Sequence, residues 1–176
     1  MTLRDVMKLD LLKDKEKVAT MVNDAKEETD VKNKLDKIKA ELDDLNFNLV
    51  PHKRGNEDKG FKFKDVSGEM EKIRDNLEDL QNVGANKHAK AFKKDIEDLE
   101  QEMNNMMEII EIWVEVQKKW IYLESIFVGS EDIRQKLVKE TQEFDVQDKN
   151  FRKLMGSINK KKSVKMLYSS ESEVNY

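Results

Sequence analysis

The sequence predicts a mainly all-α protein: an elongated bundle of long antiparallel helices, with a small β-hairpin around residues 46–65 as its one exception. Composition is the first reason, because 40% of the 176 residues are charged and there are only six glycines and one proline. Such chains favour helices, since Lys, Glu, Leu and Met lose little side-chain freedom there. The second reason is that hydrophobic residues recur at steps of three and four along most of the chain. With 38% hydrophobic residues, a compact core is hard to fill, so we expect an elongated shape or one that packs against further polypeptide.

The first predicted helix runs from about Thr2 to Phe47. One face carries a hydrophobic stripe at steps of four and three residues, made of Val31, Leu35, Ile38, Leu42 and Leu45, and extended upstream by Val18, Val22 and Ala25. The dense charges between Asp10 and Lys17 indicate a kink or a break. The helix should end before Pro51, because a residue that precedes proline is disfavoured in the α region.

The segment from Asn46 to Asp65 changes to a period of two. Phe47 and Leu49, then Phe61 and Phe63, alternate with polar residues, and turn-forming residues lie between the two runs. This pattern predicts a β-hairpin with a long tip. A solvated loop is the alternative that the residues leave open.

Two further helices should follow, from about Val66 to Val83 and from about Lys87 to Phe127, separated by a stop at Gly84. The longer one carries a heptad stripe, made of Phe92, Ile96, Leu99, Met103, Met106, Ile110, Trp113, Gln117 and Trp120. Near its end two more hydrophobic rows appear, namely Ile109, Val116 and Leu123, and Met107, Val114 and Ile121. A helix that is apolar on several faces is normally buried, so this end should lie at the centre of the fold.

The last predicted helix begins after a break at Gly129-Ser130, with Ser130 as its N-cap. An interruption is expected near Asp145. The inward residues should be Ile133, Leu137, Phe144, Phe151 and Leu154. Residues 1–160 would form the helical bundle, and residues 161–176 a polar, partly disordered tail that begins in the lysine run at 160–162.

Composition and charge also exclude several classes of function. The net charge is −4, with basic and acidic residues mixed along the chain, which argues against nucleic acid as a partner. No hydrophobic run approaches the roughly 18 residues that a membrane span needs, and the N-terminus lacks the apolar core of a signal peptide. The absence of cysteine excludes disulfides and thiolate metal sites. A cytoplasmic protein is the simplest interpretation.

No constellation of residues points to catalysis, a metal or a cofactor. Gly55 and Gly60 have the spacing of a phosphate-binding loop, but Phe61-Lys62 follows where that motif needs Lys and then Ser or Thr. His52, expected in a loop, and His88 lack a second ligand at helical spacing. No carboxylates stand out as a buried pair. Gln117 lies in the stripe between Trp113 and Trp120, where we interpret it as a core polar residue bonded to backbone or indole, with a ligand contact as the lesser alternative.

The segment from Trp113 to Phe127, WVEVQKKWIYLESIF, resembles the signature of dynein heavy chains, which reads W, VQ, W, YLE and IF. The signature and core-packing residues are Trp113, Val116, Gln117, Trp120, Tyr122, Leu123, Glu124, Ile126 and Phe127. The similarity extends over about Thr2 to Met155, and includes the short helix that follows from Ser130. The sequence departs from the family where tryptophan is usual, at Leu42, Leu99 and Phe151, and where proline is usual, at Val138; it is therefore similar to a divergent member.

The resemblance implies the N-terminal part of the linker, next to the tail. In this family the linker arches over a ring of ATPase modules and transmits its ATP-driven changes to the tail during minus-end-directed movement on microtubules. ATP and Mg²⁺ would bind in the ring, so no cofactor and no catalytic residue are expected in this chain. The implied partners are the rest of the heavy chain and, through it, the intermediate and light chains. The implied location is the cytoskeleton, with the axoneme of a cilium or flagellum favoured over the cytoplasm.

An alternative class is a free-standing coiled-coil adaptor. An adaptor built on the Phe92–Trp120 stripe should form a parallel dimer, whereas a linker segment should fold that stripe against its own first and last helices and remain a monomer.

Overall fold

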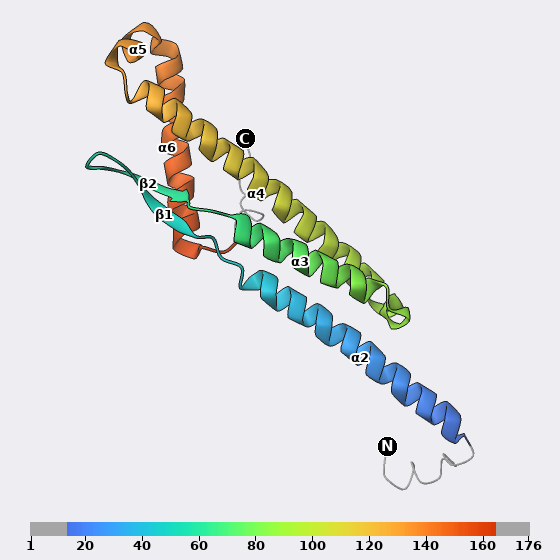
Figure 1. The fold of residues 1–176 in the computed structure, drawn as a ribbon. Coiled ribbons are helices and arrows are strands. Elements are labelled where there is room, and N and C mark those ends of the chain that lie inside the picture. Colours follow the sequence, from blue (N-terminus) through green and yellow to red (C-terminus); the bar gives the residue numbers. More distant parts are fainter. Residues whose placement is uncertain (1–13, 165–176) are drawn as a thin grey trace.

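A computed structural model describes residues 14–164 as an elongated helical molecule with a β-hairpin at one side (Figure 1). The mainly α-helical prediction is confirmed. In chain order the elements are α2 (Lys15–Asp43), β1 (Leu49–Arg54), β2 (Glu57–Phe63), α3 (Ser67–Gly84), the 3₁₀ helix η1 (Lys87–Phe92), α4 (Lys93–Phe127), α5 (Glu131–Lys136) and α6 (Val138–Lys161). Among these elements, no helix has the length and hydrophobicity that crossing a bilayer requires.

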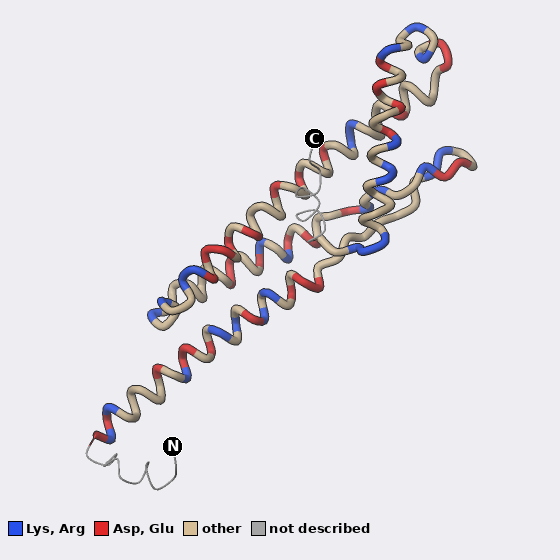
Figure 2. Tube along the Cα trace, turned by 180° about the vertical axis from the view of Figure 1, so that it is seen from behind, with Lys and Arg blue, Asp and Glu red and all other residues tan. Residues whose placement is uncertain are grey.

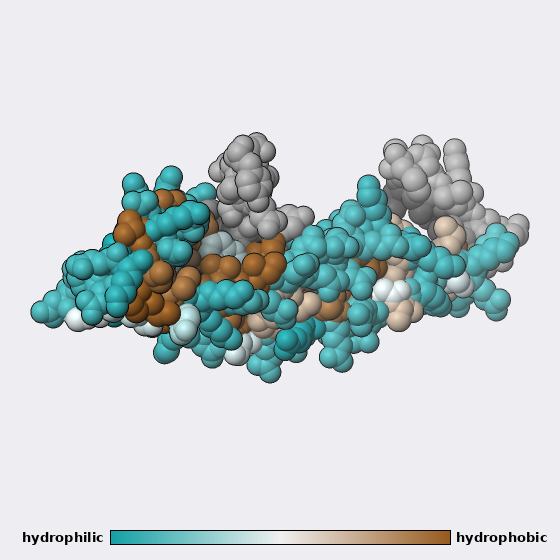
Figure 3. All heavy atoms as spheres, turned by 90° about the horizontal axis from the view of Figure 1, so that it is seen from above, coloured by the Kyte–Doolittle hydropathy of each residue, from teal (hydrophilic) through white to brown (hydrophobic). Residues whose placement is uncertain are grey.

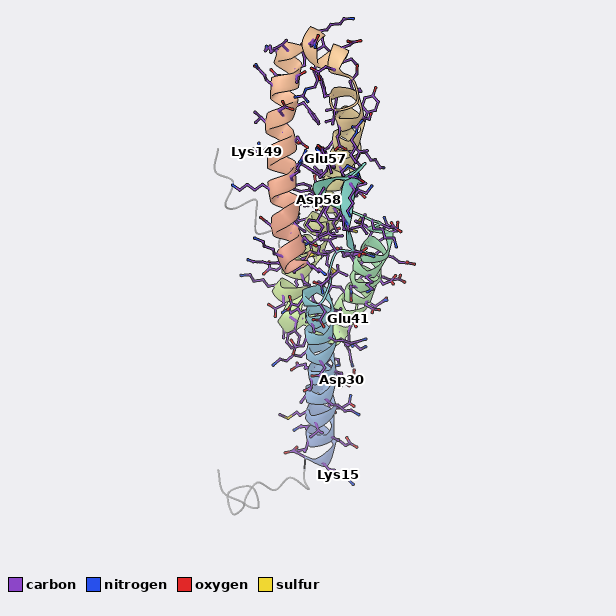
Figure 4. All side chains as sticks on the ribbon, turned by 90° about the vertical axis from the view of Figure 1, so that its left-hand side faces the viewer. Lys15, Asp30, Glu41, Glu57, Asp58 and Lys149 are labelled. Atoms are coloured by element: carbon purple, nitrogen blue, oxygen red, sulfur yellow. The ribbon has the colours of Figure 1, made fainter. Side chains whose placement is uncertain are left out.

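Helices α2, α3 and α4 lie side by side and alternate in direction, whereas α6 crosses the far end of α4 (Figure 1). The predicted stripe of α2 is buried from Val31 to Leu42. Its upstream extension is not, since Val22 is 64% exposed. The reason is that the first half of α2 extends past the end of α3. Figure 4 shows Lys15, Asp30 and Glu41 spaced along this helix. The predicted helical residues 2–13 lie outside the described part of the chain.

Residues 46–65 form the predicted hairpin and not a solvated loop, but the expected long tip is wrong, because only Gly55 and Asn56 separate β1 from β2. β1 and β2 pair antiparallel, with Leu49 opposite Phe63 and a register irregularity after Pro51. That irregularity suits a residue that cannot donate a ladder hydrogen bond. Gly55 (φ 58°) and Gly60 (φ 96°) adopt positive φ angles, so the hairpin backbone itself accounts for both glycines of the phosphate-loop-like spacing.

The longest helix starts later than predicted. Residues Lys87–Phe92 form the 3₁₀ turn η1, and α4 begins only at Lys93. The Asn86 side chain accepts a hydrogen bond from the His88 backbone N–H at 2.9 Å, which caps the tighter turn. A short 3₁₀ segment is common at the start of an α-helix.

The break before the last helix is confirmed, but the interruption near Asp145 is wrong. Ser130 caps α5, with its hydroxyl oxygen 3.4 Å from the Ile133 N–H. The chain then kinks at Leu137, and α6 runs unbroken through Asp145. Arg134 of α5 pairs with Asp145 at 2.8 Å, which fastens the short helix to the long one. Leu137 is at the kink and 43% exposed, so its predicted inward position is also wrong.

The chain after α6 is attached to the segment that follows α2. The Phe47 N–H donates to the Lys162 carbonyl at 2.8 Å, and the Val164 N–H donates to the Leu45 carbonyl at 3.0 Å. Val164 is 1% exposed. Within the predicted tail, residues 162–164 therefore have fixed partners; residues 165–176 lie outside the described range, and the division of the chain at residue 160 stays a prediction.

Lys162 gives a first testable consequence. It ends α6 in the left-handed conformation, with φ 56°, where a Cβ is unfavourable and glycine is the usual residue. We expect Lys162→Gly to raise the free energy of unfolding by about 1 kcal/mol, measured by urea denaturation. Lys161→Gly is the matched control, because Lys161 is the last helical residue and should lose about 0.5–1 kcal/mol instead. Equal destabilisation by both changes would contradict the interpretation.

Candidate functional site: the junction of α4, the hairpin and α6

The signature segment forms the last four turns of α4. Its inward residues are Trp113, Gln117, Trp120, Glu124 and Phe127, which continue the heptad stripe at steps of four and three. They face the β-hairpin and α6, and both of these elements contact this end of α4 (Figure 1). We call this meeting point the junction.

Trp120 is the central hydrophobic residue of the junction. It is 5% exposed, its ring stacks on Phe151 of α6 at 4.4 Å between centroids, and His52 of β1 packs edge-on at 4.9 Å. The indole N–H donates to Asp148 at 3.0 Å, and Arg152 holds the same carboxylate. One side chain of α4 therefore contacts both the hairpin and α6.

Gln117 fastens the hairpin to α4 by two hydrogen bonds. Its side-chain oxygen accepts from the Phe63 N–H at 2.7 Å, and its side-chain NH₂ donates to the Phe63 carbonyl at 3.1 Å. The Gln117 side-chain amide thus bonds the backbone N–H and carbonyl of Phe63 in the way that a neighbouring strand would bond the outer edge of β2. This satisfies the backbone groups of a buried residue, and the interpretation of Gln117 as a core polar residue bonded to backbone is confirmed.

Glu124 and His52 form a buried pair that the residue patterns did not reveal. Glu124 is 3% exposed, His52 is 8% exposed, and His52 Nε2 lies 2.7 Å from Glu124 Oε2. Arg54, two residues beyond His52 in β1, donates to the Glu124 backbone carbonyl at 2.6 Å. A carboxylate in the last turn of a helix faces the negative end of the helix dipole, so these two strand residues offset an otherwise unfavourable position.

One earlier interpretation is corrected by this pair, because His52 is in strand β1 and not in a loop. Its partner Glu124 is a single buried carboxylate. The inward position of Glu124 could be predicted from the heptad stripe, since Glu124 follows Trp120 by four residues and precedes Phe127 by three. The sequence could not predict that His52 is the partner of Glu124, because 72 residues separate the two.

The signature residues occupy three kinds of position. Trp120, Glu124 and Phe127 are buried, and Trp113, Gln117 and Ile126 are partly buried. Val116 (41%), Tyr122 (65%) and Leu123 (38%) are exposed. The expectation that the widened apolar end of α4 is buried on several faces is therefore wrong within residues 14–164. The bundle covers only one side of α4 there, because α6 crosses it and no described helix lies along the other side.

Two of the exposed residues, Val116 and Leu123, line a groove between α4 and α6. Trp113, Val116 and Leu123 form one wall, and Phe144, Phe151 and Leu154 form the other; we call this the α4–α6 groove. Its volume is about 340 Å³ and it is open to solvent. Figure 3 shows hydrophobic side chains among hydrophilic ones at the end of the molecule where α4 and α6 lie.

The described residues bring together no group of three or more His, Asp or Glu side chains suited to a metal ion. His88 lies far from His52 along the fold, with its Nε2 3.7 Å from Asp24 of α2. Several surface carboxylates pair with a Lys one helical turn away. Lys119, for example, lies 2.7 Å from Glu115, and its hydrogen bond and charge lower the pKa of that carboxyl group. The polar groups of the junction thus connect elements to one another.

Gln117→Leu tests the role of the amide. The leucine fits the hydrophobic stripe but leaves the Phe63 N–H and carbonyl without partners, so we expect a loss of about 1–3 kcal/mol in unfolding free energy. Amide hydrogen exchange should rise in β1 and β2 while α3 changes little. Gln101→Leu, at an exposed site earlier on α4, is the control. Unchanged exchange in the hairpin would show that Gln117 does not hold it.

These features define a class: a long helical segment in which the inward side chains at one end of α4 join the hairpin and α6 to that helix. The comparisons name the family. Residues 1–174 match the family described as dynein heavy chain, N-terminal region 2, and the chain belongs to the dynein heavy chain family.

Individual proteins that this chain resembles are also dynein chains. The chain is 32% identical over 154 residues to the dynein-1-alpha heavy chain of the flagellar inner arm I1 complex of Chlamydomonas reinhardtii. It is 30% identical over 155 residues to human dynein axonemal heavy chain 10, and 31% identical over 164 residues to the ciliary dynein beta chain of Heliocidaris crassispina. These alignments cover 88–93% of this chain but only 3–4% of each relative. The chain thus spans a small part of the length of its relatives.

Proposed function

We propose that this chain is the N-terminal part of a dynein linker and transmits the ATP-driven movement of a motor ring to the tail. The observation that carries the proposal is the junction. Two hydrogen bonds between Gln117 and the Phe63 backbone, the His52–Glu124 pair and the Trp120 stack fix the hairpin and α6 to one end of α4. Force applied at one element is then passed to the others, since side chains held by several partners resist relative movement.

Catalysis belongs elsewhere in this proposal. ATP and Mg²⁺ bind in the ring, which supplies the energy, and this segment carries load. Its partners are the rest of the heavy chain and, through it, the intermediate and light chains. Microtubule movement in a cilium or flagellum is the setting that the names of the relatives favour.

The direct experiment uses a heavy chain that contains this segment. A fluorescent donor at position 101 on exposed α4 and an acceptor in the ring should report a change in transfer efficiency between ADP and ATP-analogue states. A constant transfer efficiency across all nucleotide states would overturn the lever role.

The adaptor alternative makes a different prediction about assembly. In the structure the central stripe residues Met103, Met106 and Ile110 are at most 2% exposed, because α3 covers them within the same chain. They are unavailable to a parallel partner unless the bundle opens. We expect the 176-residue chain to be a monomer by light scattering at micromolar concentration. A stable dimer that Met106→Asp dissociates would favour the adaptor.

A further inference from the structure

The α4–α6 groove is an apolar feature of the described surface that the junction leaves open to solvent. Its two walls are regular: α4 contributes residues 113, 116, 120 and 123, and α6 contributes residues 144, 147, 151 and 154. Both rows advance by three, four and three residues. Two such rows on neighbouring helices provide the ridges and spaces into which a third helix packs.

The apolar row on α4 continues beyond the groove. Ile112 is 52% exposed and lies one turn before Val116. An isolated exposed hydrophobic residue is ordinary, but a contiguous exposed patch marks an interaction surface. The length of the row favours a helix of several turns over a small molecule.

The charges on α4 indicate how a helix bound in the groove would be oriented. From Asp95 to Glu115, α4 carries eight carboxylates and no Lys or Arg, and red segments recur between tan ones along this helix (Figure 2). Lys119 at the groove is engaged by Glu115 at 2.7 Å. The end of the groove near Glu108 therefore favours basic side chains, which gain from carboxylates that face them across a packed helix.

We infer that the α4–α6 groove is filled by an amphipathic helix from another part of the same heavy chain, with hydrophobic residues at helical spacing and Lys or Arg near Glu108. The inference rests on the proposed function. Its source follows from length, since the relatives carry more than nine-tenths of their polypeptide outside the matched region. A segment of the same chain also binds without the entropic cost of bringing two molecules together.

The absence of cysteine from the sequence allows a specific test. Val116→Cys places a thiol in the groove, and Asn104→Cys places one on the exposed face of α4. Each variant is made in the 176-residue chain and in the intact heavy chain purified free of accessory subunits. Maleimide labelling of the peptide that contains the new thiol is followed by mass spectrometry.

The cysteine at 116 should label about tenfold more slowly in the heavy chain than in the 176-residue chain, because burial requires local opening before reaction. The cysteine at 104 should label at similar rates in both. Glu108→Lys combined with Glu115→Lys should restore much of the labelling at 116 in the heavy chain, whereas Glu97→Lys combined with Glu100→Lys should not.

Equal labelling of position 116 in both proteins would overturn the inference. So would protection that requires accessory subunits, or protection in the 176-residue chain that grows with its concentration, since these would identify a separate partner or a second copy. If position 116 labels rapidly in the intact heavy chain and that heavy chain still moves microtubules, the groove inference fails while the lever role survives. The two proposals can thus fail separately.

Discussion

Trp120→Ala is expected to lower the free energy of unfolding by about 3–5 kcal/mol, the usual cost of truncating a large buried aromatic side chain. Three contacts are lost together: the stack on Phe151, the edge contact with His52 and the hydrogen bond to Asp148. The first two leave a cavity between all three elements of the junction, and the third leaves a carboxylate with fewer partners. Urea denaturation followed by circular dichroism measures the change.

Tyr122→Ala is the matched control for this prediction. Tyr122 lies two residues away on the same helix but is 65% exposed, so its truncation should change stability by no more than about 0.5 kcal/mol. If the two variants lose similar amounts, Trp120 is not the central residue of the junction.

His52→Ala is expected to cost about 1–3 kcal/mol, because it leaves a buried Glu124 side-chain oxygen without its hydrogen-bond partner. Glu124 already has one side-chain oxygen, Oε1, without a hydrogen-bond partner within the described residues. Removing His52 therefore leaves both oxygens unsatisfied. The loss should depend little on salt, since a buried pair is poorly screened.

The double variant His52→Leu with Glu124→Leu separates the pair from its parts. Replacing both partners of a buried hydrogen bond by hydrophobic groups of similar shape can be nearly neutral, so we expect the double variant to be more stable than His52→Ala. Lys93→Ala is the surface control, since its pair with Glu97 is exposed and worth at most about 0.5 kcal/mol. A double variant that is less stable than His52→Ala would show that the pair contributes directly to stability.

Much of the fold could be predicted because its helices are long and periodic. The stripe from Leu99 to Ile110 has the correct face and the correct burial. The hairpin stayed open to two interpretations because its runs are short and their stability comes from elsewhere. Gln117 supplies hydrogen bonds to Phe63 from 54 residues away, and no local pattern reveals such a partner.

The exposed end of α4 shows the opposite difficulty. Hydrophobic rows indicate that a surface is suited to burial, but they do not say which polypeptide buries it. Val116 and Leu123 have the pattern of core residues and are exposed among residues 14–164. Likewise, the interruption expected near Asp145 does not occur, and Asp145 pairs instead with Arg134 within a continuous α6.

Coupling between ATP hydrolysis and movement is the most direct measure of whether the junction transmits force. In a heavy chain that contains this segment, Gln117→Leu should loosen the hairpin while leaving the ring untouched. We expect microtubule-stimulated ATP hydrolysis to stay near that of the unmodified protein while gliding velocity falls, and Gln101→Leu to alter neither. Unchanged velocity in a Gln117→Leu motor whose hairpin is shown by hydrogen exchange to be loosened would contradict a load-bearing role for the junction.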